Sequence, residues 1–418
     1  MSGLIHRFSK FRRRFGSLLW THPGFFPFPG AVRRIGAAAL TSCLLITLLS
    51  CQESPEEIIL RLEQQIQAGK YAESEKEIRQ LIQSQNQQHS TTLSEKAAER
   101  IFAVSLDHTA FAWYENGILT YRTLGIIKEV GLPQKPDQIL LSYSGKTALA
   151  EYRNRPGSEG KCSYDFIQII QGEVKPDVLE TDCENTPAVT DTGDRLYFSD
   201  GKHLFMKDMS DGKKAMVVAS GAFKEKFKKV KNRFHIASLP GGEIWIFYGE
   251  GGFYNLYHYK GSGRPDLFME GVASPRLFGS VPRDFLSKDE AEQLQAESLF
   301  AGDPAVFLYT GAAGNYKLQL VHLPDQKGPE YDVGIREDMF YVTEREEFLL
   351  VRKNYLCYLN PVSRKYTQLP LEVEKIFVYS EGVAYVDPDG KLLLRSRGFS
   401  DFEKNLHRLK EEVASESR

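Results

Sequence analysis

Over most of its length the sequence alternates between short apolar and aromatic runs and tight turns that contain glycine. The clearest copy begins at Pro187, where an apolar run, the turn Asp191–Asp194 and a second run, Leu196–Ser199, follow one another. Runs of this length with a period of two predict β-strands that are joined as hairpins. The chain is therefore predicted to be mainly β.

Six further segments repeat this pattern at spacings of roughly 35 to 60 residues, as the blades of a propeller do. They begin at Phe111, Ile139, Ala237, Ala305, Met339 and Val383. A propeller suits such a chain because it leaves few sheet edges exposed. We predict a seven-bladed β-propeller over residues 105–398, with six or eight blades as open alternatives.

The unit around Gly193 resembles the WD40-like repeats of periplasmic propellers of the TolB type, which read strand, Ser-Pro-Asp-Gly, strand. The last unit places a similar turn, Asp387–Gly390, at a later hairpin. The resemblance extends to the lipoprotein propeller of the outer-membrane assembly machinery. It covers the β region only and implies a binding or scaffold role in maintenance of the cell envelope.

A basic leader precedes the folded part of the chain. It has seven Lys and Arg residues and no acidic residue before Glu53, followed by an apolar run from Ile35. This arrangement is typical of an export signal. The run ends in Leu-Leu-Ser-Cys at Cys51, which resembles the lipobox of bacterial lipoproteins and implies that Cys51 is lipidated and becomes the mature N-terminus. A membrane-spanning helix is the alternative, but it would need roughly 20 apolar residues.

Residues 1–50 are therefore set aside as a lipoprotein signal peptide. Val32 is a possible true start, because Arg33, Arg34 and the apolar run alone have ordinary signal proportions; a twin-arginine signal is the rival interpretation. The lipid would hold the protein at the cell envelope. Gln52 follows the anchor, and by the sorting rule of the best-known lipoproteins this favours the outer membrane, on its periplasmic or outer face.

Residues 51–104 are predicted to form a helical neck. Ser54–Glu57 is a capping box, and the corner Ala68–Tyr71 joins two helices in a hairpin that resembles a tetratricopeptide unit. A second capping box, Thr92–Glu95, predicts a third helix that ends near Phe102. We expect a spacer that lifts the propeller off the membrane, with a partner-binding repeat as the alternative.

The last segment, residues 399–418, is predicted to be an amphipathic helix. Ser400 and Glu403 form its capping box. Its apolar stripe contains Phe402, Leu406, Leu409 and Val413. This helix would dock on the neck or bind a partner.

Cys162 and Cys183 are predicted to form a disulfide. Cys162 comes before one predicted strand and Cys183 comes after the next, so an antiparallel pair brings them together. Export permits the bond, which would contribute roughly 3 kcal/mol in the chain-entropy description. Two free thiols are the alternative. Cys357 lies inside an apolar run and is predicted to be a buried thiol.

The charge balance becomes acidic once the leader is removed, with 46 Lys and Arg against 55 Asp and Glu. This balance argues against a nucleic-acid binder, which normally has a basic domain. One basic run stands out as a possible patch for anionic lipid or another anionic polymer. It contains Lys224, Lys226, Lys228, Lys229, Lys231 and Arg233. The alternative is a solvated segment between blades.

The sequence contains no familiar catalytic or metal-binding motif, and its histidines are scattered without metal-ligand spacing. We therefore expect no cofactor, no metal and no catalytic residue. The favoured function is a lipid-anchored binding or scaffold module whose partners are the membrane and other envelope proteins. An extracytoplasmic enzyme whose active site combines residues of several blades at the propeller mouth is the alternative.

Overall fold

The computed structural model describes residues 53–95, 101–153, 155, 160–223, 232–250, 252–281, 284, 286, 305–312, 314–334 and 337–416. The chain divides into two compact units, Met1–Leu60 and Arg61–Arg418.

The first unit contains the start of helix α3 (Pro55–Gln67). The predicted capping box is present there, because the Glu57 amide donates to Ser54 Oγ at 3.2 Å and the Ser54 amide to Glu57 Oε2 at 2.8 Å.

The described strands of the second unit form four four-stranded sheets and one eleven-stranded sheet. The first sheet contains β2 (Ile101–Val104), β3 (Phe111–Glu115), β4 (Ile118–Thr123) and β5 (Ile126–Gly131). The second contains β6 (Gln138–Leu141), β7 (Thr147–Tyr152), β8 (Lys161–Gln168) and β9 (Glu173–Asp182). The third contains β10 (Ala188–Val189), β11 (Arg195–Ser199), β12 (Leu204–Asp208) and β13 (Lys214–Val218).

The eleven-stranded sheet begins with β14 (Arg233–Ser238), β15 (Ile244–Glu250), β16 (Phe253–Tyr259) and β17 (Asp266–Val281). It continues with β18 (Ala305–Thr310), β19 (Lys317–His322), β20 (Gln326–Asp332), β21 (Met339–Val342), β22 (Glu347–Arg352), β23 (Tyr355–Leu359) and β24 (Tyr366–Glu372). The last sheet joins β25 (Lys375–Tyr379), β26 (Gly382–Val386) and β27 (Leu392–Arg395) to β1 (Thr91–Ser94).

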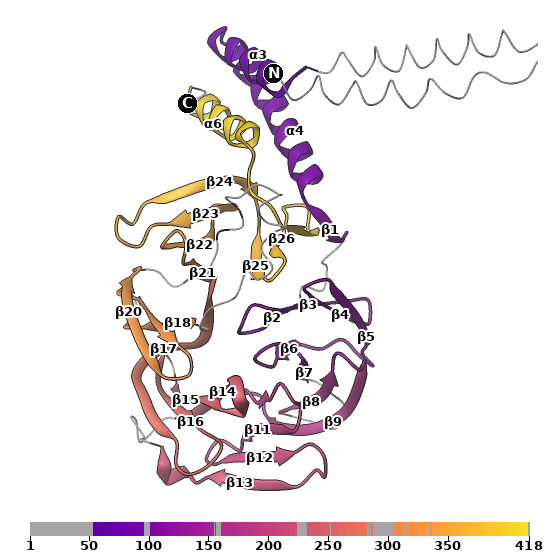
Figure 1. Cartoon of the computed structure of the whole chain (residues 1–418), viewed down its shortest axis with the longest axis vertical. Helices are drawn as coiled ribbons and strands as arrows, with labels where there is room; N and C mark the ends of the chain where they lie inside the picture. The colour runs from indigo at the N-terminus through magenta and orange to yellow at the C-terminus, as the bar shows by residue number, and fades with distance from the viewer. Residues whose placement is uncertain are drawn as a thin grey trace, which may run out of the picture. The chain divides into compact units, whose positions relative to one another are not determined.

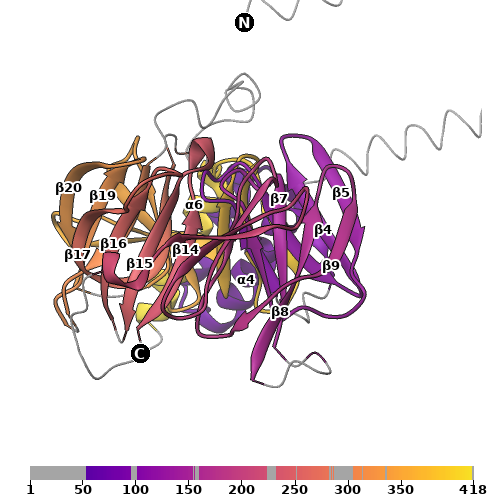
Figure 2. The ribbon, with the colours of Figure 1, turned by 90° about the horizontal axis from the view of Figure 1, so that it is seen from below.

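The long strand β17 explains why one sheet contains eleven strands. Its first part pairs with β16 and its second part with β18, with a register shift between Val272 and Leu277. Its last residues, Ser280 and Val281, pair in parallel with β21. The sheet is therefore three antiparallel meanders in series, β14–β17, β17–β20 and β21–β24. Figure 2 shows β14, β15 and β16 of the first meander side by side.

The turn glycines of the sequence repeat have a physical role in this packing. Gly193 has a φ of +70°, a conformation that residues with a Cβ rarely adopt. A Cβ at Gly193 would also lie 2.8 Å from the ring of Phe166 in the second sheet. The hairpin glycine therefore permits both the tight turn and the close approach of the neighbouring sheet.

The sheets of the second unit follow one another around a common centre in sequence order (Figure 1). Hydrophobic clusters lie between consecutive sheets, as between the first and second sheets and between the second and third. The last sheet packs on the first in the same way, with the rings of Phe102 and Phe377 4.7 Å apart and those of Phe111 and Tyr379 5.4 Å apart. The Ser380 hydroxyl also donates to the Thr109 carbonyl at 2.7 Å.

The predicted third neck helix is wrong. Thr91–Ser94 forms β1, which pairs antiparallel with β27, and Ile101–Val104 forms β2. The strands therefore begin at Thr91, before the predicted boundary at residue 104. The physical reason is that β27 would otherwise be an unpaired outer edge, and its backbone groups pair with β1. This long-range pairing overrides the local capping signal.

Two helices of the second unit contact each other. Helix α4 (Tyr71–His89) packs against the C-terminal helix α6 (Asp401–Glu416). The predicted cap of α6 is present, with the Glu403 amide donating to Ser400 Oγ at 3.2 Å. Of the predicted apolar stripe, Leu406, Leu409 and Val413 are fully buried. The C-terminal helix therefore docks on the second neck helix, which was one of the two predicted alternatives.

A buried ion pair joins α6 to the last sheet. The guanidinium of Arg395 is fully buried and donates to both carboxylate oxygens of Glu403, at 2.9 and 3.1 Å. It also donates to the carbonyls of Arg397 and Gly398 and lies over the ring of Phe399. Such a pair needs both partners, because either charge alone would be buried without compensation.

We expect Glu403→Ala to lower the free energy of unfolding by about 3–5 kcal/mol, because it leaves the Arg395 charge buried and unpaired. Urea unfolding measures the loss. The matched control is Glu416→Ala at an exposed position of the same helix, which should change stability by less than about 0.5 kcal/mol. Equal losses in both variants would contradict the role of the pair, whereas the double variant Arg395→Met/Glu403→Leu should recover most of the stability.

Candidate functional site

The inner strands of the second unit line one central cavity of about 500 Å³. Its wall contains residues of β2, β6, β10, β14, β17, β21 and β25, so every meander contributes one strand. Most of the lining residues have apolar side chains, among them Ile139, Val189, Ile236 and Phe340, but polar and apolar atoms contribute about equally to the surface of the cavity. The cavity is the concave site that the fold builds from all of its sheets.

The charged side chains of the cavity wall have partners within the protein. Arg276 Nη1 and Asp338 Oδ1 are 3.0 Å apart in an ion pair that solvent reaches. The ammonium of Lys375 lies 5.2 Å from the ring centre of Phe377 and 5.8 Å from that of Phe102, in cation–π geometry. The wall therefore offers paired charges and apolar surface to anything that enters.

His108 lies at the centre and contacts three other meanders. Its Nδ1 donates to the Val378 carbonyl at 2.8 Å, and its ring meets that of Phe340 edge-on at 5.6 Å. Gly279 faces its Nε2, where a Cβ on Gly279 would lie only 1.2 Å away. Burial lowers the pKa of His108, because the charged imidazolium would lose its hydration. His108 is therefore a neutral packing and hydrogen-bonding residue.

Two further histidines, His235 and His258, lie on different strands, β14 and β16, of the eleven-stranded sheet. His235 Nδ1 is 2.9 Å from Thr186 Oγ1, and burial lowers the pKa of His235 to about 4. His258 is buried with its Nε2 2.5 Å from Glu243 Oε2. No group of three or more His, Cys, Asp or Glu side chains that could hold a metal ion occurs within the described part of the chain. These histidines serve local contacts within the sheets.

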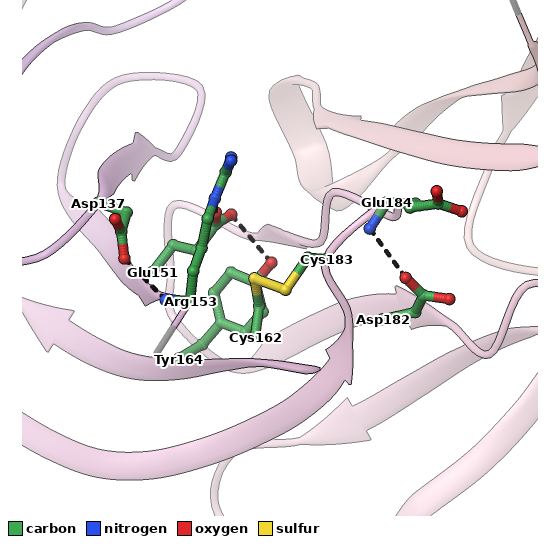
Figure 3. Close-up of a disulfide and its surroundings, with 8 residues drawn as sticks. All are labelled: Asp137, Glu151, Arg153, Cys162, Tyr164, Asp182, Cys183 and Glu184. Carbon is green, nitrogen blue, oxygen red and sulfur yellow. Dashed lines mark hydrogen bonds and ion pairs between the residues drawn. A yellow bond between two sulfur atoms is a disulfide. The ribbon is translucent and has the colours of Figure 1, made fainter. Parts of the chain in front are cut away.

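The structure joins Cys162 and Cys183 in a disulfide, as the order of the strands indicated (Figure 3). Cys162 is the second residue of β8 and Cys183 follows the end of β9, and the two strands are antiparallel neighbours. Close by, the Tyr164 hydroxyl donates to the buried carboxylate of Glu151 at 3.0 Å. The disulfide ties the segment between the second and third sheets to β8. Cys357 is buried, and this burial raises the pKa of its thiol to about 11.

The basic run lies largely outside the described residues, which exclude Lys224, Lys226, Lys228, Lys229 and Lys231. Arg233 is described, and its Nη2 lies 3.1 Å from Glu184 Oε1 and 3.3 Å from Glu250 Oε1. The structure places the Arg233 charge in ion pairs, and the cationic patch stays a prediction from the sequence. The Arg233 guanidinium lies between these two carboxylates, which hold the start of β14 in place.

A second cavity, of about 780 Å³, lies between α4, α6, β24 and the last sheet. Lys410 on its wall binds the Glu372 carboxylate at 2.5 Å and the Tyr355 hydroxyl. Burial alone would lower the pKa of Lys410, but these hydrogen bonds raise it above the ordinary value. Lys410 therefore stays charged and fixes α6 on β23 and β24.

The membrane-related predictions fall mostly outside the structure. Cys51 and Gln52 are not among the described residues, and neither is the remainder of the leader. Among the helices that are described, none has the length and apolar character needed to cross a membrane. The lipid anchor therefore stays a prediction from the sequence.

Solved structures similar to this chain include TolB and other β-propeller proteins. Dipeptidyl peptidase 4 from Porphyromonas gingivalis has 10% identity and a TM-score of 0.38, over 76% of this chain and 62% of its own. TolB from Acinetobacter baumannii has 10% identity and a TM-score of 0.35, over 71% and 63%. A chain of the mitotic checkpoint complex has 9% identity and a TM-score of 0.38, over 71% and 90%.

This chain spans less than two thirds of the dipeptidyl peptidase and of TolB. No protein-family model and no curated protein matches it.

The sequence did not indicate the central residues. His108, Asp338 and the β17 residues Arg276 and Gly279 come from three separate stretches of sequence. No spacing connects them, so only the arrangement of the sheets brings them together. The left-handed conformation of His108, with a φ of 58°, is seen only in the structure.

We expect Gly279→Ala to lower the free energy of unfolding by about 1–3 kcal/mol or more, because the new methyl group would overlap the His108 ring. Thermal and urea unfolding measure the change. Gly131→Ala is the matched control, since Gly131 also lies in a strand and has nothing within 4 Å of the position that a Cβ would take. Equal stability of the two variants would show that His108 can move aside freely.

Proposed function

We propose that this protein is a lipid-anchored, seven-bladed β-propeller of the cell envelope that acts as a binding or scaffold module. The four four-stranded sheets and the three meanders of the eleven-stranded sheet support a count of seven blades. The contacts between the first and last sheets support a ring whose ends are packed on each other.

The observation that carries the binding role is the central cavity. It combines one inner strand from every meander with lining residues that are mostly apolar in type and with the ion pair Arg276–Asp338. Such a cavity can recognise a partner by shape and apolar contact without a bond-breaking step. The wall is formed by packed inner strands of every meander, so the surface is present before a partner binds.

The anchor and the setting rest on the sequence. The basic leader and the Leu-Leu-Ser-Cys junction support lipidation at Cys51. Gln52 after the anchor supports the outer membrane, and the acidic mature chain suits protein partners of the envelope better than nucleic acid. Membrane fractionation with protease shaving of intact cells tests the placement, and recovery solely with the inner membrane would contradict it.

We expect Cys51→Ala to leave the protein soluble or unprocessed, because lipid attachment requires that thiol. Detergent phase partitioning and the mass of the mature N-terminus measure the outcome. Cys43→Ala, which changes the other cysteine of the leader, should partition and be processed like the unchanged protein. Normal processing and partitioning of the Cys51 variant would exclude the lipid anchor.

We expect a photo-crosslinking residue at Phe340 in the cavity wall to capture a defined envelope protein in intact cells. The control position is Val362, which is 90% exposed in a turn outside the cavity wall. An adduct at Phe340 that is missing at Val362 would support the binding role. Adducts at neither position, together with turnover of a small substrate that Phe340→Trp blocks, would favour an enzyme with its active site in the cavity.

A further inference from the structure

The outer edge of the first sheet differs from the other outer edges among the described strands. The pairings of the outer strands β1, β9, β13, β20 and β24 each contain a register shift, and so does the pairing of β16 with β17. In contrast, β5 pairs with β4 over six consecutive residue pairs without a shift. Register shifts and bulges protect sheet edges from other strands. The edge of β5 lacks this protection.

The outer strands also differ in their proline content. Pro176 lies in β9, Pro329 in β20 and Pro370 in β24, whereas β5 contains none. A proline removes a backbone donor and so weakens an edge as a template for pairing. The edge of β5 can therefore offer its complete set of backbone groups.

The direction of those groups follows from one hydrogen bond. The Leu132 amide donates to the Gly117 carbonyl at 2.8 Å, next to the pair Ile118 and Gly131. In an antiparallel ladder alternate residues bond the same neighbour. The backbone groups of Ile127, Glu129 and Gly131 therefore point away from β4, and an extended strand is the partner that fits such a row.

Two apolar side chains of β5 are exposed beside its charged residues Lys128 and Glu129. Ile126 is 46% exposed and Ile127 is 55% exposed, on opposite faces of the strand. Leu124, in the turn before β5, is 64% exposed. A strand added here would bury apolar surface on both faces. Figure 1 shows β5 at the outer margin of the first sheet, and Figure 2 shows it there from a second direction.

The last sheet holds this edge in position. Glu381 Oε2 accepts from Arg122 Nε at 2.5 Å, and its Oε1 accepts from the Gly125 amide at 2.8 Å. The Thr123 hydroxyl donates to the Thr109 carbonyl at 2.6 Å. The hairpin before β5 is therefore fixed before a partner arrives, which reduces the ordering cost of binding.

The charges of β5 disfavour a second copy of this chain as the added strand. A two-fold axis between two identical antiparallel edges places one residue opposite its own copy. Centring such a pair on β5 brings either Lys128 opposite Lys128 or Glu129 opposite Glu129. Like charges directly opposite each other destabilise a sheet. A strand of another protein with the reverse order of charges fits the edge better.

We propose that β5 is a docking edge for an extended strand of another protein, which adds antiparallel with an acidic residue opposite Lys128 and a basic residue opposite Glu129. The inference rests on the proposed binding role and gives it a partner class. Affinity would come from the backbone ladder and the exposed isoleucines. Register and selectivity would come from the two charge pairs.

Two peptides of identical composition test this proposal. Acetyl-Thr-Val-Lys-Glu-Val-Ile-Thr-amide places its Lys opposite Glu129 and its Glu opposite Lys128, and acetyl-Thr-Val-Glu-Lys-Val-Ile-Thr-amide places like charges opposite each other. We expect the full chain, extracted in detergent, to bind the first peptide roughly fivefold more tightly, because two attractive pairs replace two repulsive ones. Fluorescence anisotropy of labelled peptides measures the two affinities.

Two variants distinguish peptide binding at the edge of β5 from non-specific peptide binding. Lys128→Glu/Glu129→Lys should invert the preference between the two peptides. Ile127→Pro removes one outward backbone donor at a position where an edge strand tolerates proline, and it should weaken both peptides by about tenfold or more. An unchanged unfolding transition in each variant shows that the first sheet is still folded.

Equal binding of the two peptides, or binding that Ile127→Pro leaves intact, would overturn the proposal. A wild-type dimer that Ile127→Pro dissociates would also overturn it, in favour of a second copy. These outcomes are separate from the test of the proposed function, because the crosslink at Phe340 reports on the cavity and not on β5.

Discussion

The contact between the first and last sheets is the constraint on which the rest of the second unit depends. A series of sheets, each packed only on its neighbours, becomes fixed in space once its two ends also pack on each other. Here the ends meet through the aromatic cluster of Phe102, Phe111 and Phe377 and through the bond from His108 to the Val378 carbonyl. This contact also determines the geometry of the cavity wall, because every meander contributes one inner strand to the wall.

Charged side chains that are partly or fully buried reinforce these contacts between elements. Glu381 in the last sheet holds both Arg122 and the Gly125 amide of the first sheet. Arg395 and Glu403 join the last sheet to α6. In each case the carboxylate receives several donors, which offsets the cost of removing the charges from water. Such pairs define one arrangement, because a shifted neighbour would leave a charge without its partner.

Inner and outer strands of this fold are constrained to different degrees. Inner strands are packed from both sides, so their side chains are set by the core. Outer strands have one free edge, and all but β5 are protected by a register shift among the described strands. The fold therefore offers two kinds of place for the binding role that we propose, the central cavity and the edge of β5, without any change to the core.

The sequence by itself determined the local features: the hairpins with their turn glycines, the apolar stripe and cap of α6, and the approach of Cys162 to Cys183. These depend on periodicity, on turn chemistry and on neighbouring strands, all of which are short-range properties. Tertiary structure alone decided that Thr91–Ser94 is a strand, that β17 serves two meanders and that Gly279 leaves room for His108. These depend on contacts between residues far apart in sequence, so no local pattern records them.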